Sequence, residues 1–514
     1  MSMNSETLKQ LPDMPKSYWR ESSSVPDCGA LDNNLTVDVA IVGGGITGIT
    51  TAYLLSKAGV KVALVEADSL FSGTTGHTTA KLTAQHDLIF DQLIHSHSEE
   101  AARQYYEANR DGMNLLKQII DEHGIDCGYV EEDAYVYAQS VDSLKKLNKE
   151  ADAYAKLGIP GGFVESIPLQ LPNHGAVVMK GQARFHPLRY LSALASLITQ
   201  AGGLLYDRTA VSRIDEDGPR PTVVTERGLR IMADHVLICS HFPFYDKHGL
   251  YFARLHAERS YVLAVRSQMT YPGGMYLSAE DPKRSLRLAE VEDGQQLLLV
   301  GGGNHKTGQG ICTIDYYESL RDFALKHFQV ESIPYRWSAQ DLTTLDKLPY
   351  IGQLTEDKPR ILVATGFAKW GMSNSQAAAQ LLTDYVLERS NPYQELFTPQ
   401  RFHLIPDVKN AIVQNADVFK NLVAGKVELV RQSPDDLANG EGGVVTIGGK
   451  RAGAYRDDEG ALHMVDTTCT HMGCEVEWND GERSWDCPCH GSRFSYKGEV
   501  MEGPAHEPLQ RVYR

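Results

Sequence analysis

The first clear pattern of hydrophobic and polar positions lies in residues 36–66, TVDVAIVGGGITGITTAYLLSKAGVKVALVE. The apolar run from Val37 to Val42 predicts a buried strand, and the small and apolar residues from Ile46 to Lys57 predict a helix packed against it. A second strand, VKVALVE, ends at Glu66. The glycine-rich turn GGGITG joins the first strand to the helix, so the pattern predicts a strand–helix–strand unit at the start of a mostly parallel sheet.

The turn of this unit has the spacing of a dinucleotide-binding motif. Its first glycine makes the tight turn, its second lets the backbone approach a pyrophosphate, and its third lets the helix pack closely on the strand. The helix N-terminus offers N–H groups to the phosphate charge, and an acid at the end of the second strand can bond ribose hydroxyls. Strand, helix, second strand and acid agree here, so the motif is strong. The candidate residues are Gly43, Gly45, Ile46, Thr47, Gly48 and Glu66.

Two later segments bear on which dinucleotide is bound, because the motif alone does not separate FAD from NAD. Residues 361–387, ILVATGFAKWGMSNSQAAAQLLTDYVL, predict a strand, a glycine-rich turn and a helix whose N-terminus could face a cofactor. The segment LLLVGGGNHKTG (297–308) looks like a second motif, but Lys306 stands at the third glycine position and no apolar helix follows. We interpret it as a glycine turn after a strand, which disfavours a nicotinamide-dependent reductase.

The arrangement over roughly residues 36–390 resembles flavoenzymes of the D-amino-acid oxidase superfamily, which includes glycine oxidase and sarcosine oxidase. The resemblance implies FAD as the cofactor, with the three glycines on its pyrophosphate and Glu66 on its adenosine ribose. It implies that the hydroxyl-rich segment FSGTTGHTTAKLT lines the pyrophosphate and flavin, and that Val211 meets the adenine through its backbone. It also implies that the later helix N-terminus faces the flavin pyrimidine edge and stabilises negative charge there. The residues concerned are Thr74, Thr75, His77, Thr78, Thr79, Val211, Gly366, Gly371, Met372 and Ser373. For any single threonine, a solvated loop is the alternative.

Two segments, 85–175 and 245–344, interrupt the nucleotide-binding pieces, and the resemblance implies that they form a mixed sheet over the flavin. Many relatives carry an arginine that binds the substrate carboxylate before a D-x-x-P-x-I-G element, but WSAQDLTTLDKLPYIG has Asp341 there. An aspartate repels a carboxylate, so a cationic amine is more consistent with this pocket; a structural or solvated acid is the alternative. Further pocket candidates are Tyr261, Arg287 and Trp370, each of which also suits an ordinary sheet or loop position.

Cysteine and histidine gather in two segments near the C-terminus, CTHMGC (469–474) and CPCHGS (487–492). Each supplies one thiolate and one imidazole. The four candidate ligands are Cys469, His471, Cys487 and His490. Such a set fits a tetrahedral zinc ion, or a [2Fe-2S] cluster with two Cys on one iron and two His on the other. Zinc would leave Cys474 and Cys489 unexplained.

Both segments closely resemble Rieske motifs, in which the extra cysteine pair, here Cys474 and Cys489, forms a disulfide between the two loops. A third segment, EGPAHEPL (502–509), resembles the proline loop that covers such a cluster. All three occur in order, which favours iron over zinc. The strand patterns KVELV, GVVTIGG, KRAGAYRD and ALHMVD, separated by glycines, predict a small antiparallel β domain that carries these loops.

The predicted fold class is α/β (α+β): a Rossmann-like FAD-binding domain with an interleaved mixed-sheet substrate domain, followed by an all-β Rieske domain. A chain of 514 residues is too long for a single core. We expect an N-terminal extension (1–35), FAD-binding parts (36–84, 176–244 and 345–390), substrate-domain parts (85–175 and 245–344), a linker (391–420) and the Rieske domain (421–514).

Charge and hydropathy narrow the partners and the compartment. A net charge of −16 and a pI of about 5.6 argue against nucleic acid or an anionic membrane surface as the main partner. The N-terminus has no apolar core of signal-peptide length, and no run has the length of a transmembrane helix. We therefore expect a soluble, cytoplasmic protein without a membrane span, although a disulfide is uncommon in that compartment.

The two implied cofactors together predict an amine-oxidising enzyme. FAD accepts hydride from a C–H next to nitrogen, and a Rieske cluster moves one electron at a time to an external acceptor protein. Two alternatives remain: a donor protein feeds the cluster and the flavin reduces or hydroxylates a substrate, or the chain is a non-enzymatic redox-sensing flavoprotein. No catalytic base is assigned, because the flavin carries the chemistry and the protein mainly positions the substrate.

The cluster motif also predicts a reduction potential. Rieske centres span about −150 to +300 mV, and hydrogen bonds to the cluster sulfurs raise the value. Ser492 is placed to give one such bond, but Phe494 stands where high-potential Rieske proteins have a tyrosine hydroxyl. We predict a potential below the top of this range, measured by redox titration with EPR detection; a value among the highest would contradict this reasoning.

Overall fold

The predicted strand–helix–strand unit forms and begins the first of two large sheets. The structure, a computed structural model, describes residues 10–246, 249–291, 296–309, 312–403 and 432–513. In it β1 (Leu35–Val42), α2 (Ile46–Lys57) and β2 (Val62–Val65) match the predicted pattern. β1 pairs in parallel with β2 on one side and with β10 (Arg230–Ile238) on the other. The carboxyl ends of these strands are the edge of the sheet at which α/β folds bind their ligands.

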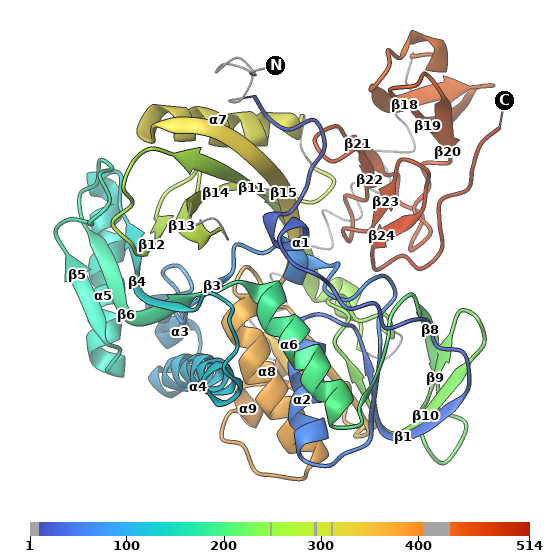
Figure 1. Cartoon of the computed structure of the whole chain (residues 1–514), viewed down its shortest axis with the longest axis horizontal. Coiled ribbons are helices and arrows are strands. Elements are labelled where there is room, and N and C mark those ends of the chain that lie inside the picture. Colours follow the sequence, from blue (N-terminus) through green and yellow to red (C-terminus); the bar gives the residue numbers. More distant parts are fainter. Residues whose placement is uncertain (1–9, 247–248, 292–295, 310–311, 404–431, 514) are drawn as a thin grey trace.

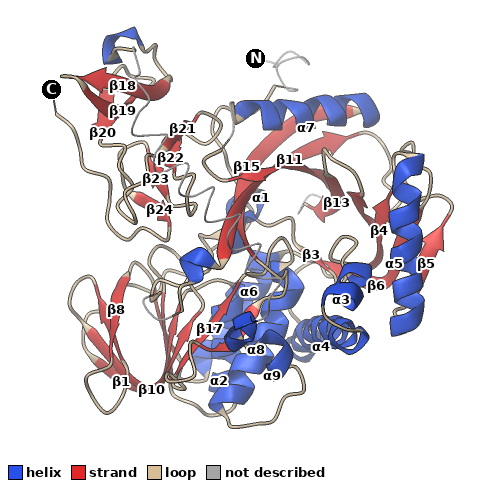
Figure 2. Ribbon diagram, turned by 180° about the vertical axis from the view of Figure 1, so that it is seen from behind, coloured by secondary structure: helices blue, strands red, loops and turns tan. Residues whose placement is uncertain are grey.

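The first sheet has eight strands in the order β16, β17, β10, β1, β2 and β7, with β9 paired to β10 and β8 to β9. The other bounds are β16 (Tyr350–Gln353), β17 (Ile361–Thr365), β7 (Leu204–Tyr206), β8 (Val211–Asp215) and β9 (Thr222–Thr225). Helices α2, α6 (Pro187–Gln200) and α8 (Gly371–Val386) lie side by side in both ribbon views (Figure 1, Figure 2) and share one hydrophobic core.

The second sheet has nine strands in the order β15, β11, β14, β13, β12, β4, β6 and β3, with β5 paired to β6. Their bounds are β15 (Val330–Thr344), β11 (Leu255–Ser267), β14 (Gln296–Lys306), β13 (Arg284–Glu290), β12 (Met275–Ser278), β4 (Val130–Tyr137), β6 (Ala176–Arg184), β3 (Lys81–Leu82) and β5 (Gly161–Val164). Helix α7 (Ile314–His327) lies across β11 and β15 in Figure 1 and buries its apolar side on one face of this sheet. The other face contributes to the core shared with α2, α6 and α8.

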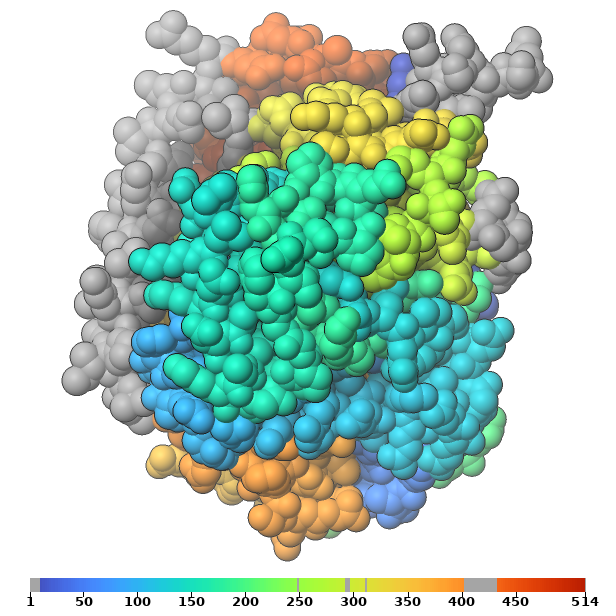
Figure 3. All heavy atoms as spheres, turned by 90° about the vertical axis from the view of Figure 1, so that its left-hand side faces the viewer, coloured from blue at the N-terminus to red at the C-terminus, as the bar shows by residue number. Residues whose placement is uncertain are grey.

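The remaining helices surround this core. They are α1 (Tyr18–Glu21), α3 (Phe90–Ser96), α4 (Glu99–His123), α5 (Leu144–Leu157) and α9 (Gln394–Phe397), with short 3-10 turns that include η2 (Thr74–His77) and η4 (Tyr251–Ala253). Viewed from the side away from the C-terminal domain, residues of the first substrate segment (teal and green) form most of the surface, with the yellow α7 region above them (Figure 3). Within the part of the chain that the structure describes, no helix is both long and apolar enough to span a bilayer.

The C-terminal region is all-β, as predicted. One sheet holds β18 (Gly442–Ile447), β19 (Lys450–Arg456) and β20 (Leu462–Val465), and the other holds β21 (Glu477–Asn479), β22 (Ser484–Asp486), β23 (Arg493–Ser495) and β24 (Val500–Glu502). All their pairings are antiparallel. The predicted strand KVELV (426–430) and residues 404–420 of the predicted linker lie outside the described residues. The predicted domain boundaries stay predictions.

One local prediction is wrong. The glycines of LLLVGGGNHKTG do not form a turn after a strand, because β14 continues through them to Lys306. Gly303 has φ +71°, and the pairing with β11 shifts register between Arg259 and Tyr261. β14 is paired on both sides, so the glycines bend the strand as a bulge instead of ending it.

A network of buried charges docks the C-terminal domain on the second sheet. Arg259 of β11 is 1% exposed and bonds the Ser338 hydroxyl, and its guanidinium lies 3.6 Å from a carboxylate oxygen of Glu482 and of Glu502. Arg493 bonds Glu502 at 2.7 Å from within the C-terminal domain. Burial alone would raise the pKa of Glu502, but Arg493 and Arg259 lower it below its usual value. Glu502 is thus held as an ion between two arginines.

Further polar contacts extend this interface. Arg336 of β15, also buried, donates to the Gly481 carbonyl at 2.7 Å. The Asp480 carboxylate accepts from the backbone N–H of Thr313, the N-cap of α7, at 2.9 Å. A carboxylate at a helix N-terminus is favourable, because it meets the positive end of the helix dipole. The docking is therefore built from specific buried groups on both sides.

We predict that Arg259→Met loosens the docked domain. The substitution removes one of two cations from a buried carboxylate pair, and breaking such pairs costs about 3–5 kcal/mol, with the low end expected here because Arg493 remains. Thermal unfolding followed by the cluster absorbance should show a lower midpoint.

The matched control is Arg220→Met. Arg220 pairs with Asp234 at 3.0 Å, but both side chains are about two-fifths exposed (40% and 41%). Loss of such a surface pair changes stability by less than about 1 kcal/mol. Equal effects of the two substitutions would show that Arg259 does not hold the domain.

Candidate active site and metal centre

Glycines shape the crevice at the end of β1. A Cβ at Gly48 would overlap the carbonyl oxygen of Gly43, so α2 approaches the turn more closely than any side chain would allow. Gly43 has φ +114°, and a Cβ there would lie 2.6 Å from the Cys239 carbonyl carbon. The sequence assigned these two glycines to close packing and to the tight turn, and the structure places them in those positions.

Two buried helix N-termini face this region without side-chain caps. Gly45 is the N-cap of α2 and offers no side chain, while Thr47 and Gly48 behind it are buried. Trp370 is the N-cap of α8 and makes no capping hydrogen bond, while Met372 and Ser373 are buried. Buried N–H groups need partners, and a pyrophosphate and the edge of a flavin supply acceptors. The residues therefore fit FAD.

Glu66 lies where the ribose contact was expected, just after β2. Its carboxylate accepts from the backbone N–H of Gly44 at 2.7 Å and of Asp68 at 3.1 Å. Burial raises the pKa of Glu66, and these hydrogen bonds oppose the increase. Val211, expected at the adenine, begins β8 and packs in one hydrophobic cluster with Val42 and Val65, the last residues of β1 and β2.

The hydroxyl-rich segment runs from α2 across the second sheet. The Thr75 hydroxyl accepts from Ile46 N–H at 3.1 Å, and the Thr74 hydroxyl donates to the Gln340 carbonyl at 2.9 Å. Further on, Thr79 lies 3.6 Å from the Cβ position of Gly301 on β14. Thr75 thus lies next to the turn at Gly45, whereas Thr74 is bonded to β15, and their contacts with the cofactor stay predictions.

Two tryptophans that the sequence did not single out fix this segment. The Trp337 indole N–H donates to the His77 carbonyl at 2.8 Å, and the Trp19 indole N–H donates to the Thr78 carbonyl at 2.7 Å. Trp337 belongs to the same short segment as Asp341, WSAQDLTTLDKLPYIG, so that segment could have drawn attention to it. Nothing in the sequence of the N-terminal extension pointed to Trp19.

Asp341 lies on β15 and has a cation beside it. Lys369 Nζ, in the loop before α8, is 3.2 Å from Asp341 Oδ2 and 3.5 Å from Glu258 Oε2 on β11. Burial raises the pKa of Asp341, and Lys369 opposes the increase. His256, whose Nε2 lies 3.6 Å from a Glu258 carboxylate oxygen, is the main cause that lowers the pKa of Glu258 to about 2. Glu258 is therefore ionised, and it shares Lys369 with the Asp341 carboxyl group.

Trp370 is placed with a histidine that the sequence reasoning missed. The ring of Trp370 stacks on His86 with centroids 4.9 Å apart, and His86 contacts the Ser373 hydroxyl at 3.0 Å and the Tyr105 hydroxyl at 2.6 Å. Burial lowers the pKa of His86 to about 3, so the imidazole is neutral at pH 7. His86 therefore supports the N-terminus of α8.

Of the other two pocket candidates, Arg287 contacts the hydroxyl-rich segment and Tyr261 does not. Arg287 donates to the Ala80 carbonyl at 2.6 Å and lies over the ring of Trp19. Tyr261 packs on the α7 side of the sheet, stacked on Tyr316 and bonded to His305 at 2.9 Å. Strand alternation alone does not say which face a residue takes, and for Tyr261 it is the face away from the hydroxyl-rich segment.

A metal centre forms between the two C-terminal loops. Cys474 and Cys489 are disulfide-bonded, while Cys469 and Cys487 are buried free thiols. The rings of His471 and His490 lie 4.9 Å apart, and the Nδ1 atom of each is buried without a hydrogen-bond partner. Burial lowers the pKa of His471 to about 4 and of His490 to about 3, so both rings are neutral, as metal ligands must be.

Two orphaned imidazole nitrogens and two free thiols fit a Rieske cluster. Each loop closes on itself, because Cys469 N–H donates to the Cys474 carbonyl and Cys487 N–H donates to the Ser492 carbonyl. The Cys474–Cys489 disulfide joins the two loops. The proline loop joins them through Ala505 N–H, which bonds the Ser492 hydroxyl at 3.0 Å. Phe494 is fully buried beside these loops.

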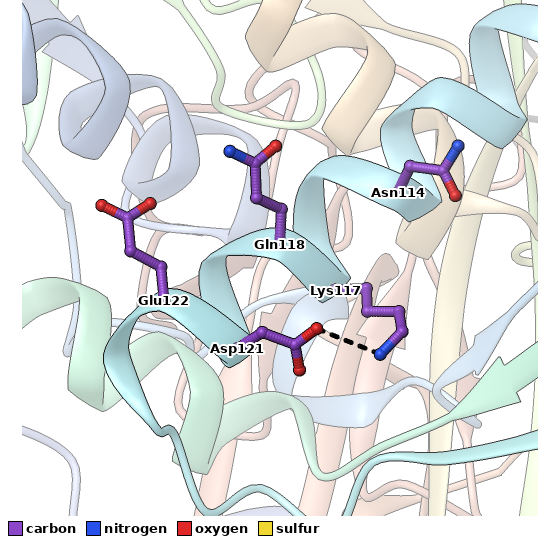
Figure 4. Close-up of a pocket in the computed structure, with 5 residues that line it drawn as sticks. All are labelled: Asn114, Lys117, Gln118, Asp121 and Glu122. Atoms are coloured by element: carbon purple, nitrogen blue, oxygen red, sulfur yellow. Dashed lines mark hydrogen bonds and ion pairs between the residues drawn. The ribbon is translucent and has the colours of Figure 1, made fainter.

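A surface hollow on α4 lies apart from both centres. It is lined by Asn114, Lys117, Gln118, Asp121 and Glu122. Figure 4 shows these polar side chains spread along the outside of the helix, with an ion pair of 3.1 Å between Lys117 and Asp121. None of the candidate cofactor residues belongs to it, and it carries no catalytic argument.

The crevice and the cysteine–histidine loops together define a flavin-dependent oxidoreductase with an iron–sulfur domain. The chain belongs to the FAD dependent oxidoreductase family (DAO), which matches residues 38–385, and residues 428–513 match the Rieske [2Fe-2S] domain. FAD and a [2Fe-2S] cluster are its cofactors, which confirms the Rieske interpretation over zinc.

Similar proteins agree with this assignment. The chain is 51% identical over 500 residues, 97% of its own length and 98% of the relative, to YhfW of Bacillus subtilis (strain 168), named as a Rieske 2Fe-2S iron-sulfur protein. It is 24% identical over 377 residues to the gamma-glutamylputrescine oxidoreductase of Escherichia coli (strain K12), covering 69% of this chain and 84% of that one. The fold is similar to glycine oxidase from Geobacillus kaustophilus, with a TM-score of 0.61 and 21% identity over 72% of this chain and 100% of that one.

We predict that six of the eight cysteines react with an alkylating reagent when the protein is unfolded without reductant, because the Cys474–Cys489 pair is oxidised. Mass spectrometry after chelation of the iron gives the count. The matched variant is Cys474→Ser, in which Cys489 loses its partner and all seven remaining cysteines should react. Eight reactive thiols in the unaltered chain would show that the pair is reduced.

Proposed function

We propose that the protein oxidises an amine at a carbon–nitrogen bond and passes the electrons singly through the Rieske cluster to an external acceptor. The observation that carries this proposal is the position of the cluster loops against the strands that border the FAD site. Gln340 on β15 bonds Gly491 beside the cluster ligand His490, while the next residue, Asp341, is paired with Lys369 in front of α8. Adjacent residues of a strand point to opposite faces, so β15 is a wall one strand thick between the two regions.

The electron count explains why two cofactors share one chain. Oxidation of an amine to an imine releases two electrons and two protons, and water then hydrolyses the imine to a carbonyl compound and an amine. Bound FAD supplies a two-electron acceptor, and the cluster carries one electron at a time. Two molecules of a one-electron acceptor are therefore reduced for each amine oxidised.

The chain's own groups position the substrate and stabilise charge. With FAD bound, the N-terminus of α8 would offer N–H groups to negative charge on the flavin, an oxyanion-hole arrangement that neutral His86 supports through Ser373. The indoles of Trp19 and Trp337 hold the His77–Thr78 backbone in place over the second sheet. No side chain needs to act as a base in this scheme.

The charge near Asp341 supports a cationic substrate. Asp341 and Glu258 outnumber Lys369, so the group attracts an ammonium and disfavours a carboxylate. By its name, the Escherichia coli relative acts on gamma-glutamylputrescine. The putrescine part of that compound carries an amine. An aliphatic amine that is bound as its cation is the substrate class that both features favour, and a short diamine is the simplest compound with which to test it.

The acceptor is a one-electron carrier that meets the cluster from outside. His490 is buried at 4% exposure, whereas His471 is only partly buried and the neighbouring Met472 is 51% exposed. An exposed methionine beside a ligand offers a soft apolar contact for a partner protein. We place this reaction in the cytoplasm.

We predict that anaerobic addition of a short diamine, without an acceptor, bleaches the flavin and produces the EPR signal of the reduced cluster. In a separate turnover experiment, two ferricyanide ions should be consumed per diamine oxidised. Asp341→Asn should raise KM roughly tenfold to a hundredfold with less effect on kcat, because it replaces a charged hydrogen-bond acceptor for the ammonium with a neutral one. Flavin content must stay unchanged.

Asp234→Asn is the control for the loss of one carboxylate, because Asp234 is exposed and pairs only at the surface with Arg220. Each part of the proposal can be rejected by a separate experimental result. Reduction by an amino acid but by no diamine would reject the cationic substrate. A bleached flavin without the EPR signal would reject the electron path. Turnover only in the presence of a reduced donor protein would reverse its direction.

A further inference from the structure

The second cluster loop, Cys487 to Gly491, sits in backbone contact with the flavin-binding half. A Cβ at Gly308 would lie 2.6 Å from the Cys487 carbonyl carbon, and Gly308 has φ +70°. On the other side of the loop, a Cβ at Gly491 would overlap the Ala257 side chain. Two glycines, one from each domain, thus let the metal loop approach more closely than side chains allow.

Polar contacts fix this approach. The Gln340 amide donates to the Gly491 carbonyl at 2.9 Å and accepts from the Thr307 hydroxyl at 2.8 Å, so both ends of the amide are used. Thr307 N–H in turn bonds the Ala257 carbonyl at 3.1 Å. Gln340 and Thr307 are both 1% exposed. A buried amide with all its partners satisfied holds one geometry, because moving it would leave donors and acceptors unpaired.

The same glutamine contacts the FAD site through its backbone. Its carbonyl accepts from the Thr74 hydroxyl at 2.9 Å, and Thr74 begins the segment assigned to the FAD pyrophosphate and flavin. Phe252 of η4 packs its ring 5.7 Å from that of His490, so the flavin-binding half also covers the histidine end of the cluster. One residue, Gln340, therefore spans from a FAD-site hydroxyl to the cluster loop.

We propose that Thr307, Gly308 and Gln340 form a fixed seat for the cluster loop and that electrons cross between the FAD site and the cluster at this seat without movement of the Rieske domain. Gln340 is a positioning residue: it holds Gly491, and hence His490, at the wall strand β15. This inference rests on the proposed electron path.

The step balances with the acceptor already named. One electron crosses the seat and reduces one of the two ferric irons of the cluster to ferrous. The external one-electron acceptor then reoxidises that iron before the second electron crosses, and the two protons from the amine pass to solvent. No further oxidant or reductant is required.

The seat is tested with Gly308→Ala. The added Cβ must move the loop by about 1 Å to reach an ordinary carbon–carbon contact. Laser-flash photoreduction of the bound flavin with EDTA as donor, followed at the cluster's optical band, measures the transfer without any substrate. We expect transfer to slow measurably, because electron transfer between two centres weakens steeply as the distance between them grows.

Gly228→Ala is the matched control. Gly228 has φ +81°, so the backbone strain is the same, but a Cβ there meets nothing within 4 Å. It should leave the transfer rate unchanged. Gln340→Met is the second variant, which removes the bond to Gly491 while keeping side-chain length. Hydrogen exchange of amides 487–494 should rise in both seat variants, because local opening becomes easier when a buried contact is lost.

Each outcome of these measurements either supports the seat or rejects it. Slower transfer with faster exchange in both seat variants, and neither in Gly228→Ala, supports the seat. An unchanged electron-transfer rate despite faster hydrogen exchange would overturn the seat. If Gly308→Ala loses the cluster, a normal transfer rate in Gln340→Met would overturn it as well. Absence of transfer in the unaltered protein would instead reject the electron path itself, independently of the seat.

Discussion

The relative placement of the two redox domains depends on Arg259, a buried cation from the sheet of one domain between carboxylates of the other. Removing charges from water is costly, and the cost is offset only when partners and hydrogen bonds are complete. Here Glu482 and Glu502 lie between Arg259 and Arg493, and Ser338 holds the first of these guanidinium groups. Another docking angle would break the contacts of Arg259 with Glu482 and Glu502, so the network favours one orientation.

This orientation decides what each face of β11 and β15 does. On one face Ala257, Arg259 and Gln340 meet the C-terminal domain, and on the other Glu258 and Asp341 surround Lys369. The period of two in a strand is what allows one wall to serve both sides. A domain that had to swing between partners would need an exposed, weakly held interface, which is the opposite of this arrangement.

The sequence predicted the features that are local in the chain. The unit at residues 36–66, the strand and helix at 361–387 and the cluster loops each lie within a short window, so spacing alone identifies them. It did not predict contacts between distant residues: His86 with Trp370, Trp19 with Thr78, or Lys369 beside Asp341. The sequence also could not predict which face of the sheet Tyr261 occupies, because the alternation of side chains along a strand does not say which face points toward the flavin-binding side. Such pairs depend on the tertiary fold, which a single sequence does not display.

The segment LLLVGGGNHKTG shows why a glycine motif is ambiguous. At Gly43 and Gly48 the missing Cβ lets a strand and a helix close around a phosphate site, and at Gly308 it lets a protein loop lie against the backbone. The physical requirement is the same at each glycine, because a neighbouring segment of the chain must approach the glycine backbone more closely than a side chain would permit. What comes close is decided by the neighbours: a helix N-terminus after Gly45, but Thr307 and the cluster loop at Gly308. A motif that lacks its helix is therefore better interpreted as a contact between backbones than as a failed nucleotide site.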